Sequence, residues 1–312
     1  MVRSRLAWAC LCALVVAQAG LLGAAAPAGA AERTAGAPVV FVHGYIYSGA
    51  CPGTDATKVF ATAMSVLRTQ GYTAPTESVS YYACDKNGPS IQTSGNPAAY
   101  FSSGKYSNGG NTNATDLRHI AYQLAWYLHG KYTSKGQAVS LVGHSMGGLI
   151  MRWALYQVQA GNPLFPAQLL VQDAVTISTP HGGILDSTSN LSWCFGGIQC
   201  TQMRPGSAFL TELKAHGENP QATGGTDWSV LGSTKCDAMT AEQATDAGDV
   251  HKIVWDGAAK PKCYAHTTYL TDTSTKVDMP LKVRHPGATG WSTMTGPHSL
   301  VMVANALKSA SW

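Results

Sequence analysis

The chain has 312 residues, of which 45% are apolar and 12% are charged, and its formal net charge is +4. A chain this long and this apolar can bury a large core, which excludes global disorder. The small positive charge includes Arg3 and Arg5 near the N-terminus, and it provides no basis for nucleic-acid binding. No Pro/Ser-rich or charged linker divides the chain, so we expect one large domain.

The first 31 residues have the three regions of a secretory signal peptide: Arg3 and Arg5, an apolar stretch over 6–22, and small residues up to Ala31. We predict cleavage after Ala30 or Ala31. An uncleaved membrane anchor is the alternative, because the apolar stretch is nearly long enough to span a bilayer. The alanine-rich tail and the cleavage pattern favour removal. The mature chain 32–312 is then expected to be a secreted, extracellular monomer without a transmembrane segment.

Cysteine usage agrees with export. Six cysteines remain after the signal, an even number that is typical of an oxidising compartment. Six cysteines allow fifteen pairings, but these fall along the chain as three successive pairs. No C-x-x-C spacing indicates zinc, and we expect neither a metal nor a cofactor. The predicted disulfides are Cys51 with Cys84, Cys194 with Cys200, and Cys236 with Cys263.

The first half of the chain predicts strands that alternate with helices. An apolar strand is predicted over 38–42, a helix over 55–70 and a second strand over 77–83. Residues 86–113 are rich in Gly, Ser and Asn and predict a long surface loop, and an amphipathic helix follows over 113–129. This order of elements favours a mostly parallel sheet with helices on both faces.

A G-x-S-x-G pattern, Gly143 to Gly147, lies between an apolar run over 138–142 and a helical pattern over 149–158. In this context the pattern indicates a nucleophile elbow, a sharp strand-to-helix turn that exposes Ser145. The turn also places the amide of Met146 at a helix N-terminus, where it can stabilise an oxyanion. The loop after the first strand is expected to provide a second oxyanion donor, the amide of Tyr45, and a plain strand-to-loop turn is the alternative.

A strand over 169–177 comes next, and residues 184–226 then interrupt the alternation. An insertion after a strand's C-terminal end lies on the side where such sheets bind ligands. The short disulfide loop with Trp193 and Phe195 is either a cap over the active site or an aromatic pair that faces the core.

A serine nucleophile needs a general base, and in this fold the base follows the acid in the chain. We predict His298, because it lies after the last strand candidate and immediately before a terminal helix over 300–307, on a path fixed by Gly296 and Pro297. His285 is a loop alternative. His266 lies inside a strand predicted over 263–270, which favours a role in the sheet.

Asp237 is the predicted acid, because a strand that begins at Trp228 ends in a turn that delivers it. Its carboxylate would orient the imidazole and stabilise the imidazolium. Asp246 and Asp249 are competitors farther from the strand end. His144 is beside the nucleophile but should point away from it, and His181 is expected to be structural or to position substrate.

These motifs together resemble the secreted bacterial lipases and esterases of the α/β-hydrolase superfamily. The motifs that carry the resemblance are Val-His-Gly-Tyr at 42–45, Gly-His-Ser-Met-Gly-Gly at 143–148, Ser-Thr-Pro-His-Gly-Gly at 178–183 and Gly-Pro-His at 296–298. The resemblance implies an eight-stranded, mostly parallel sheet and hydrolysis of carboxylic esters of lipidic acyl chains. It matches Ser145 to the nucleophile, Asp237 to the acid, His298 to the base, and Tyr45 with Met146 to the oxyanion donors.

We therefore predict a serine carboxylester hydrolase, a lipase or fatty-acyl esterase, whose substrate is a lipidic or other ester that can lie at a lipid–water interface. An acyltransferase or a polyester depolymerase would use the same three residues. A binding protein on an inactive hydrolase scaffold is the non-enzymatic alternative, and a complete set of nucleophile, acid and base disfavours it.

Overall fold

The computed structural model describes residues 36–46, 51–96, 100, 106–184, 194 and 197–308 of the chain. The predicted signal peptide, 1–31, lies outside these ranges, as do Trp193 and Phe195. Within the described ranges, every helix is too short or too polar to cross a bilayer.

The centre of the molecule is a single sheet of eight strands in the order β2-β1-β3-β4-β5-β6-β7-β8. The pairs from β2 to β6 are parallel, whereas β7 and β8 extend the sheet as an antiparallel hairpin. The strands are β1 (Val39–Val42), β2 (Thr76–Ser78), β3 (Val139–His144), β4 (Val171–Ile177), β5 (Asp227–Ser233), β6 (His251–Trp255), β7 (Val277–Arg284) and β8 (Ser292–Pro297).

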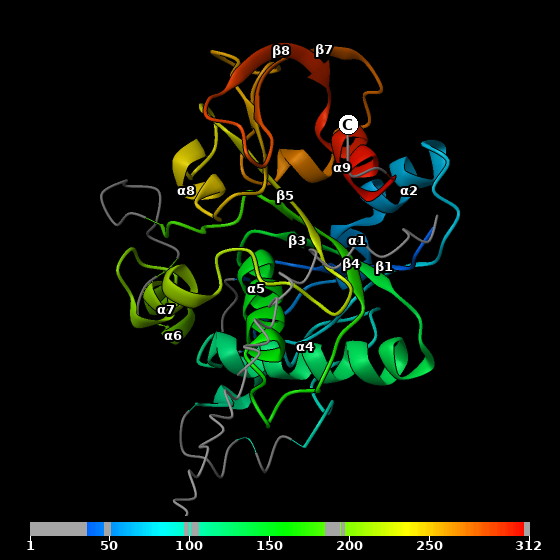
Figure 1. Cartoon of the computed structure of the whole chain (residues 1–312), viewed down its shortest axis with the longest axis vertical. Coiled ribbons are helices and arrows are strands. Elements are labelled where there is room, and N and C mark those ends of the chain that lie inside the picture. Colours follow the sequence, from blue (N-terminus) through cyan, green and yellow to red (C-terminus); the bar gives the residue numbers. More distant parts are fainter. Residues whose placement is uncertain are drawn as a thin grey trace, which may run out of the picture.

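Helices cover both faces of this sheet (Figure 1). The described chain also contains the 3-10 turns η1 (Gly109–Asn111), η2 (Thr133–Lys135) and η3 (Thr268–Leu270). The α-helices are α1 (Ala56–Val59), α2 (Ala61–Thr69), α4 (Leu117–Lys131), α5 (Met146–Gln159), α6 (Ile198–Gln202), α7 (Ala208–His216), α8 (Ala241–Thr245) and α9 (Ser299–Lys308).

Two hydrophobic cores lie on opposite faces of the sheet. Successive side chains of a strand point to opposite faces, so Val40 and Val42 of β1 join a core with α4, α5 and α7, whereas Val39 and Phe41 join a core with α2 and α9. Figure 1 shows α2 and α9, from opposite ends of the described chain, close to each other, and the Lys308 ammonium donates to the Gln70 carbonyl at 3.0 Å. The predicted α/β-hydrolase architecture, with a mostly parallel sheet between helices, is confirmed.

The three predicted disulfides are all present: Cys51–Cys84, Cys194–Cys200 and Cys236–Cys263. The first joins the segment after β1 to the segment after β2, and the third joins the loop after β5 to the loop after β6. Two of the three therefore fasten loops at the end of the sheet where the candidate nucleophile lies.

One predicted element is wrong. The strand predicted over 263–270 is a loop that contains η3, and local hydrogen bonds hold it, from the amide of Thr268 to the carbonyl of Ala265 and from the amide of Leu270 to the carbonyl of Thr267. Its β-type apolar residues are buried for a different reason: Tyr264 and Tyr269 pack on Trp255 of β6. Because these aromatic residues are buried in a loop, the segment has the composition of a strand without its backbone structure.

Candidate active site

Ser145 lies on a sharp turn between β3 and α5. Its backbone has φ 55° and ψ −131°, a conformation that residues other than glycine rarely adopt. A Cβ on Gly143 would lie 2.6 Å from the Gly148 amide nitrogen, and one on Gly147 would lie 2.1 Å from the Val42 carbonyl oxygen. The two glycines are therefore required by the close approach of backbone, and the turn has the geometry of the predicted nucleophile elbow.

The histidine that reaches Ser145 is His266. Its Nε2 lies 2.9 Å from the Ser145 hydroxyl, and its Nδ1 lies 3.1 Å from Oδ1 of Asp237. Because the carboxylate can only accept, Nδ1 carries the hydrogen and Nε2 is free to accept the serine proton. The three side chains form a continuous relay from the elbow to the loop after β5.

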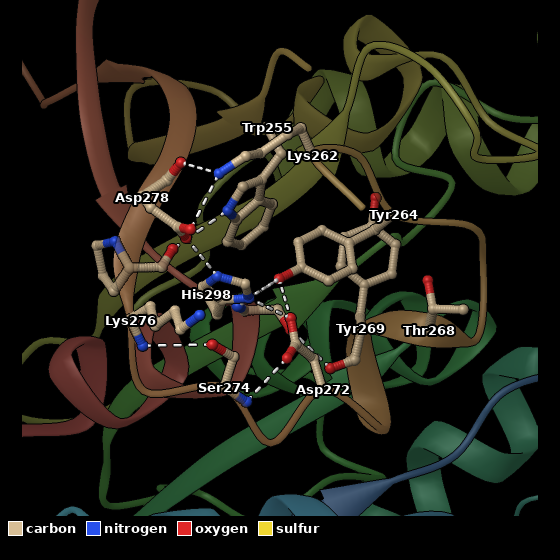
Figure 2. A network of polar contacts seen from close by, with 12 residues as sticks. Trp255, Lys262, Tyr264, Thr268, Tyr269, Asp272, Ser274, Lys276, Asp278 and His298 are labelled. Atoms are coloured by element: carbon tan, nitrogen blue, oxygen red, sulfur yellow. Dashed lines mark hydrogen bonds and ion pairs between the residues drawn. The ribbon is translucent and has the colours of Figure 1, made fainter. Parts of the chain in front are cut away.

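The prediction of His298 as the base is wrong. His298 lies between two carboxylates, with Nδ1 2.6 Å from Asp272 and Nε2 2.8 Å from Asp278 (Figure 2). The reason is topological: β8, the strand that precedes His298, is the outermost strand of the antiparallel extension, so its end is remote from β3. The histidine that contacts Ser145 instead comes from the loop after β6, the last parallel strand.

Asp237 lies where the sequence predicted it, but two further side chains hold its carboxylate. The hydroxyls of Ser178 and Tyr269 donate to Oδ2 at 2.6 and 2.8 Å. The Ser178 hydroxyl also lies 2.9 Å from Nδ1 of His266, so it contacts both members of the acid–base pair. Burial alone would raise the pKa of Asp237, but the hydrogen bonds from His266, Ser178 and Tyr269 outweigh it and lower the pKa.

His144 contacts both the backbone and the ring of His266. Its Nε2 donates to the backbone carbonyl of His266 at 2.7 Å, and the two rings are 4.8 Å apart. Burial, and to a smaller extent the neighbouring His266, lowers the pKa of His144 to about 3. His144 is therefore a neutral side chain that fixes the base loop, in agreement with the expectation that it is not the base.

The loop that contains Tyr45 contacts the elbow closely. A Cβ on Gly44 would lie 2.7 Å from the Ser145 Cβ, so only glycine fits there. The preceding His43 is fully buried and binds Asp85 through Nε2 at 3.0 Å. The Tyr81 hydroxyl donates to the carbonyls of His43 and Gly44 at 2.6 and 3.0 Å. These contacts fix the backbone immediately before the Tyr45 amide.

Asp85 is the anchor of this loop. Besides His43, it accepts hydrogen bonds from the amides of Thr54, Tyr81 and Tyr82, each at 2.8 Å. Burial would raise its pKa, but the hydrogen bond and charge of His43 and the amide donors lower it. The adjoining Cys51–Cys84 disulfide holds the same segment covalently.

A cavity of about 350 Å³ opens onto Ser145 and His266. Its volume is within the range of small-molecule sites. One side consists of the Gly44 loop and of α1, and the other consists of the base loop. Apolar walls are contributed by Ile46, Val59 and Leu270, and the cationic Lys58 also lines the cavity. An ester with an apolar acyl group fits such a lining.

The predicted competitors have other partners. Asp246 binds Lys214 at 3.0 Å, and Asp249 accepts from the Gly287 amide at 2.9 Å. His285 lies against His251, with their Nδ1 atoms 2.8 Å apart. His181 is buried and bonds to the Thr176 hydroxyl at 2.9 Å. None of these four residues lines the cavity.

The described part of segment 184–226 forms α6 and α7. Phe209 of α7 stacks on Trp153 of α5 at 4.9 Å, and both side chains are buried in the core. Its described residues do not line the cavity. The aromatic residues of the disulfide loop lie outside the described ranges, so the cap stays a prediction.

Four contributors to the site were missed: His266, Ser178, Tyr269 and Asp85. A signal for His266 was present in the predicted disulfide. Because Cys236 bonds Cys263, with 5.9 Å between their Cα atoms, residues just after each cysteine must lie close together. Asp237 and His266 are such residues. Tyr269 carried no signal in the sequence, and Ser178, although it opens the Ser-Thr-Pro-His-Gly-Gly motif at 178–183, carried none for a contact with Asp237.

Part of the chain is similar to a known protein family. Residues 90–217 match the family described as "Putative serine esterase (DUF676)". The matched stretch includes Ser145 but ends before Asp237 and His266. No protein in the curated set matches the sequence. The family match and the arrangement around Ser145 support a serine hydrolase that acts on esters.

Several solved structures are similar in part. Lipase B of Aspergillus fumigatus is 16% identical over 77% of this chain and 51% of its own, with a TM-score of 0.47. The mature lipase BlEst2 of Bacillus licheniformis is 19% identical over 64% of this chain and 67% of its own, with a TM-score of 0.39. Phospholipase PlaB of Legionella pneumophila is 15% identical over 64% of this chain, with a TM-score of 0.38, and only 38% of its length is covered.

Proposed function

We propose that the protein is a secreted serine carboxylester hydrolase, a lipase or fatty-acyl esterase, with Ser145 as nucleophile, His266 as general base and Asp237 as the orienting acid. The observation that carries the proposal is the unbroken hydrogen-bonded relay from Asp237 through His266 to a strained serine beside an apolar cavity. Acyl transfer through a serine requires these three roles at these distances.

In the proposed reaction Ser145 attacks the ester carbonyl while Nε2 of His266 takes its proton. The amides of Tyr45 and Met146 would stabilise the oxyanion, because Tyr45 follows the fixed Gly44 and Met146 begins α5, where its amide has no partner within the helix. His266 then gives the proton to the leaving alcohol. Water attacks the acyl-enzyme with the same proton transfers, which releases the acid and restores Ser145.

The lining of the cavity supports an apolar acyl group, since Ile46, Val59 and Leu270 line the same cavity as Ser145. An acyltransferase would differ only in the second nucleophile, an alcohol in place of water. Product analysis in the presence of added alcohol separates the two reactions. Hydrolysis rates of p-nitrophenyl esters from C2 to C16, above and below the concentration at which they aggregate, would define the acyl preference and test the cap.

Export is the second part of the proposal. It is supported by the charged, apolar and small-residue regions of segment 1–31 and by the three disulfides. N-terminal sequencing of the protein recovered from culture medium tests it: a chain that begins at residue 31 or 32 is expected, whereas retention of the full N-terminus in the membrane fraction would contradict it.

Ser145→Ala tests the chemistry. It is expected to abolish p-nitrophenyl butyrate hydrolysis and labelling by a fluorophosphonate probe, because loss of the nucleophile costs about 10⁶ in rate. Ser134→Ala is the matched control, since Ser134 is exposed and its hydroxyl only donates to the Gly130 carbonyl. Circular dichroism should show both variants folded. Retention of more than a few per cent of activity in Ser145→Ala would exclude the assignment.

A further inference from the structure

A second cavity, of about 360 Å³, lies between α8 and the strands β6 and β7. It shares no lining residue with the cavity at Ser145. Figure 1 shows α8 beside the β7–β8 hairpin, away from α1 and α2. The lining includes Lys252 of β6, Arg284 of β7 and Trp291 of the connection between β7 and β8.

Lys252 and Arg284 face each other across the two strands. They are direct partners in the antiparallel register of β6 and β7. Like charges at directly opposite positions destabilise a sheet. The sequence therefore breaks a local rule of sheet stability at this place, and such violations are typical of functional positions.

The described residues provide no direct counter-ion for this pair. Lys252 is only 9% exposed, and its ammonium forms no ion pair with a described carboxylate; Asp246, Glu218 and Asp249 act on it only through their more distant charges. The Nε of Arg284 is buried and has no hydrogen-bond partner among them. Burial of an unpaired cation is costly. Burial and then the charge of Arg284 lower the pKa of Lys252.

The carboxylates of Asp246, Glu218 and Asp249 raise the pKa of Lys252 by less than burial and Arg284 lower it, so they balance its charge only in part. Asp246 is bound by Lys214 at 3.0 Å, and Asp249 accepts from the Gly287 amide at 2.9 Å. Glu242 is exposed to solvent on α8. A ligand with a negative charge would therefore balance the positive charges of Lys252 and Arg284 in this cavity.

Trp291 determines the rest of the ligand. It is one of the few large apolar side chains exposed in the described part of the chain, at 44%. It also borders an adjoining cavity of about 170 Å³, lined in part by Ala241 and Val254. An aromatic face next to apolar space accepts a flat or apolar group.

We propose that this cavity binds a small organic anion, whose carboxylate or phosphate lies between Lys252 and Arg284 and whose apolar body packs against Trp291. Arg binds such groups through two parallel hydrogen bonds, and Lys acts as a point charge beside it. The site is separate from the ester-hydrolysing centre, so it would exist even if the proposed reaction were wrong.

Titration calorimetry of the full mature chain at low ionic strength tests the proposal, with benzoate and phenyl phosphate as the two anionic probes. Both or either should bind, benzyl alcohol should not, and salt should weaken binding. Preference for one probe identifies carboxylate or phosphate as the ligand group. Lys252→Met and Arg284→Gln should each weaken binding at least tenfold, and Trp291→Ala should weaken it by a smaller factor.

The control is Lys308→Met, which removes one positive charge from the end of α9, outside the lining of this cavity, and should bind both probes normally. A purely structural role for Lys252 is separated by thermal unfolding without probe: relief of like-charge repulsion should leave the midpoint of Lys252→Met equal to or above that of the native chain. Unchanged affinity in both charge variants, or no binding of either probe to the native chain, would overturn the proposal.

Discussion

Two clusters of histidine and aspartate lie on the same side of the molecule, and only one of them reaches a serine. In the first, which we call the relay, His266 bridges Asp237 and Ser145. In the second, which we call the clamp, His298 bridges Asp272 and Asp278, and the Tyr264 hydroxyl donates to Asp272. Both histidines follow a strand of the same sheet.

The difference lies in what the second ring nitrogen faces. Nε2 of His266 faces a hydroxyl that can give up a proton, whereas Nε2 of His298 faces a carboxylate that can only accept. The clamp also joins the loop before β7 to β7 itself and to the start of α9, so it fastens the antiparallel extension to the core (Figure 2). An Asp–His pair is thus a catalytic signal only if the outer nitrogen meets a nucleophile.

The comparison is tested most directly by the two histidines. His266→Ala should lower kcat for p-nitrophenyl butyrate by about 10⁴ to 10⁶, because the serine loses its base. His298→Ala should leave kcat within a few-fold but lower the thermal midpoint by roughly 2 to 4 °C, since it leaves two carboxylates without their shared donor. If His298→Ala inactivated a folded enzyme, the functional distinction between the clusters would be lost.

The aspartates provide the next largest contrast. Asp237→Asn should lower kcat by about 10⁴, because the amide favours the wrong tautomer of His266. Asp272→Asn should change kcat by only a few-fold. Steady-state rates with the same ester, together with the rate of fluorophosphonate labelling, measure both effects. Equal losses in the two variants would contradict the separation of relay and clamp.

Ser178 sharpens the description of the relay. Ser178→Ala should lower kcat about 10- to 100-fold with little change in KM, since it removes a hydrogen bond to a charged group that holds the acid and contacts the base. Ser140→Ala is a matched control, because Ser140 donates to Asp173 at 2.8 Å elsewhere in the sheet. That variant should lose stability and keep its kcat; a KM effect confined to Ser178→Ala would argue against a positioning role.

The smallest effect concerns pH and stability. The pKa of His144 is about 3 in the folded protein and about 6.5 when unfolded, so between these values the unfolded chain binds more protons. Stability should therefore fall as pH falls from about 6.5 towards 3. His144→Gln, which retains a donor for the His266 carbonyl but cannot titrate, should show a shallower fall in urea unfolding at pH 7, 5 and 4. His216→Gln, at an exposed histidine, is the control; identical slopes for native and His144→Gln proteins would refute this account.

Local patterns were enough to predict the elbow turn, the position of Asp237 and the disulfides. The glycines around Ser145 are required by backbone clearance, and this requirement is visible in five residues. Asp237 follows a strongly apolar strand, and the competing aspartates lie farther from the end of that strand. In both places the residue's position along the chain determines its position in the site.

The base could not be located in the same way, because its position depends on how the sheet ends. The sequence does not mark the change from parallel to antiparallel strands after β6, and the hairpin of β7 and β8 moved His298 away from the elbow. Ser178 was missed because its role arises from a contact 59 residues away with Asp237. Contacts between residues so far apart in the chain produce no periodic pattern in the amino-acid sequence.

The disulfide between Cys236 and Cys263 links the formation of a covalent bond to the assembly of the site. Asp237, the proposed acid, follows Cys236, and His266, the proposed base, comes three residues after Cys263, so one covalent link holds both loops. We expect that a newly made chain, whose thiols are still reduced, holds its acid and base on two independent loops and hydrolyses esters poorly. Formation of this disulfide would then complete the active site.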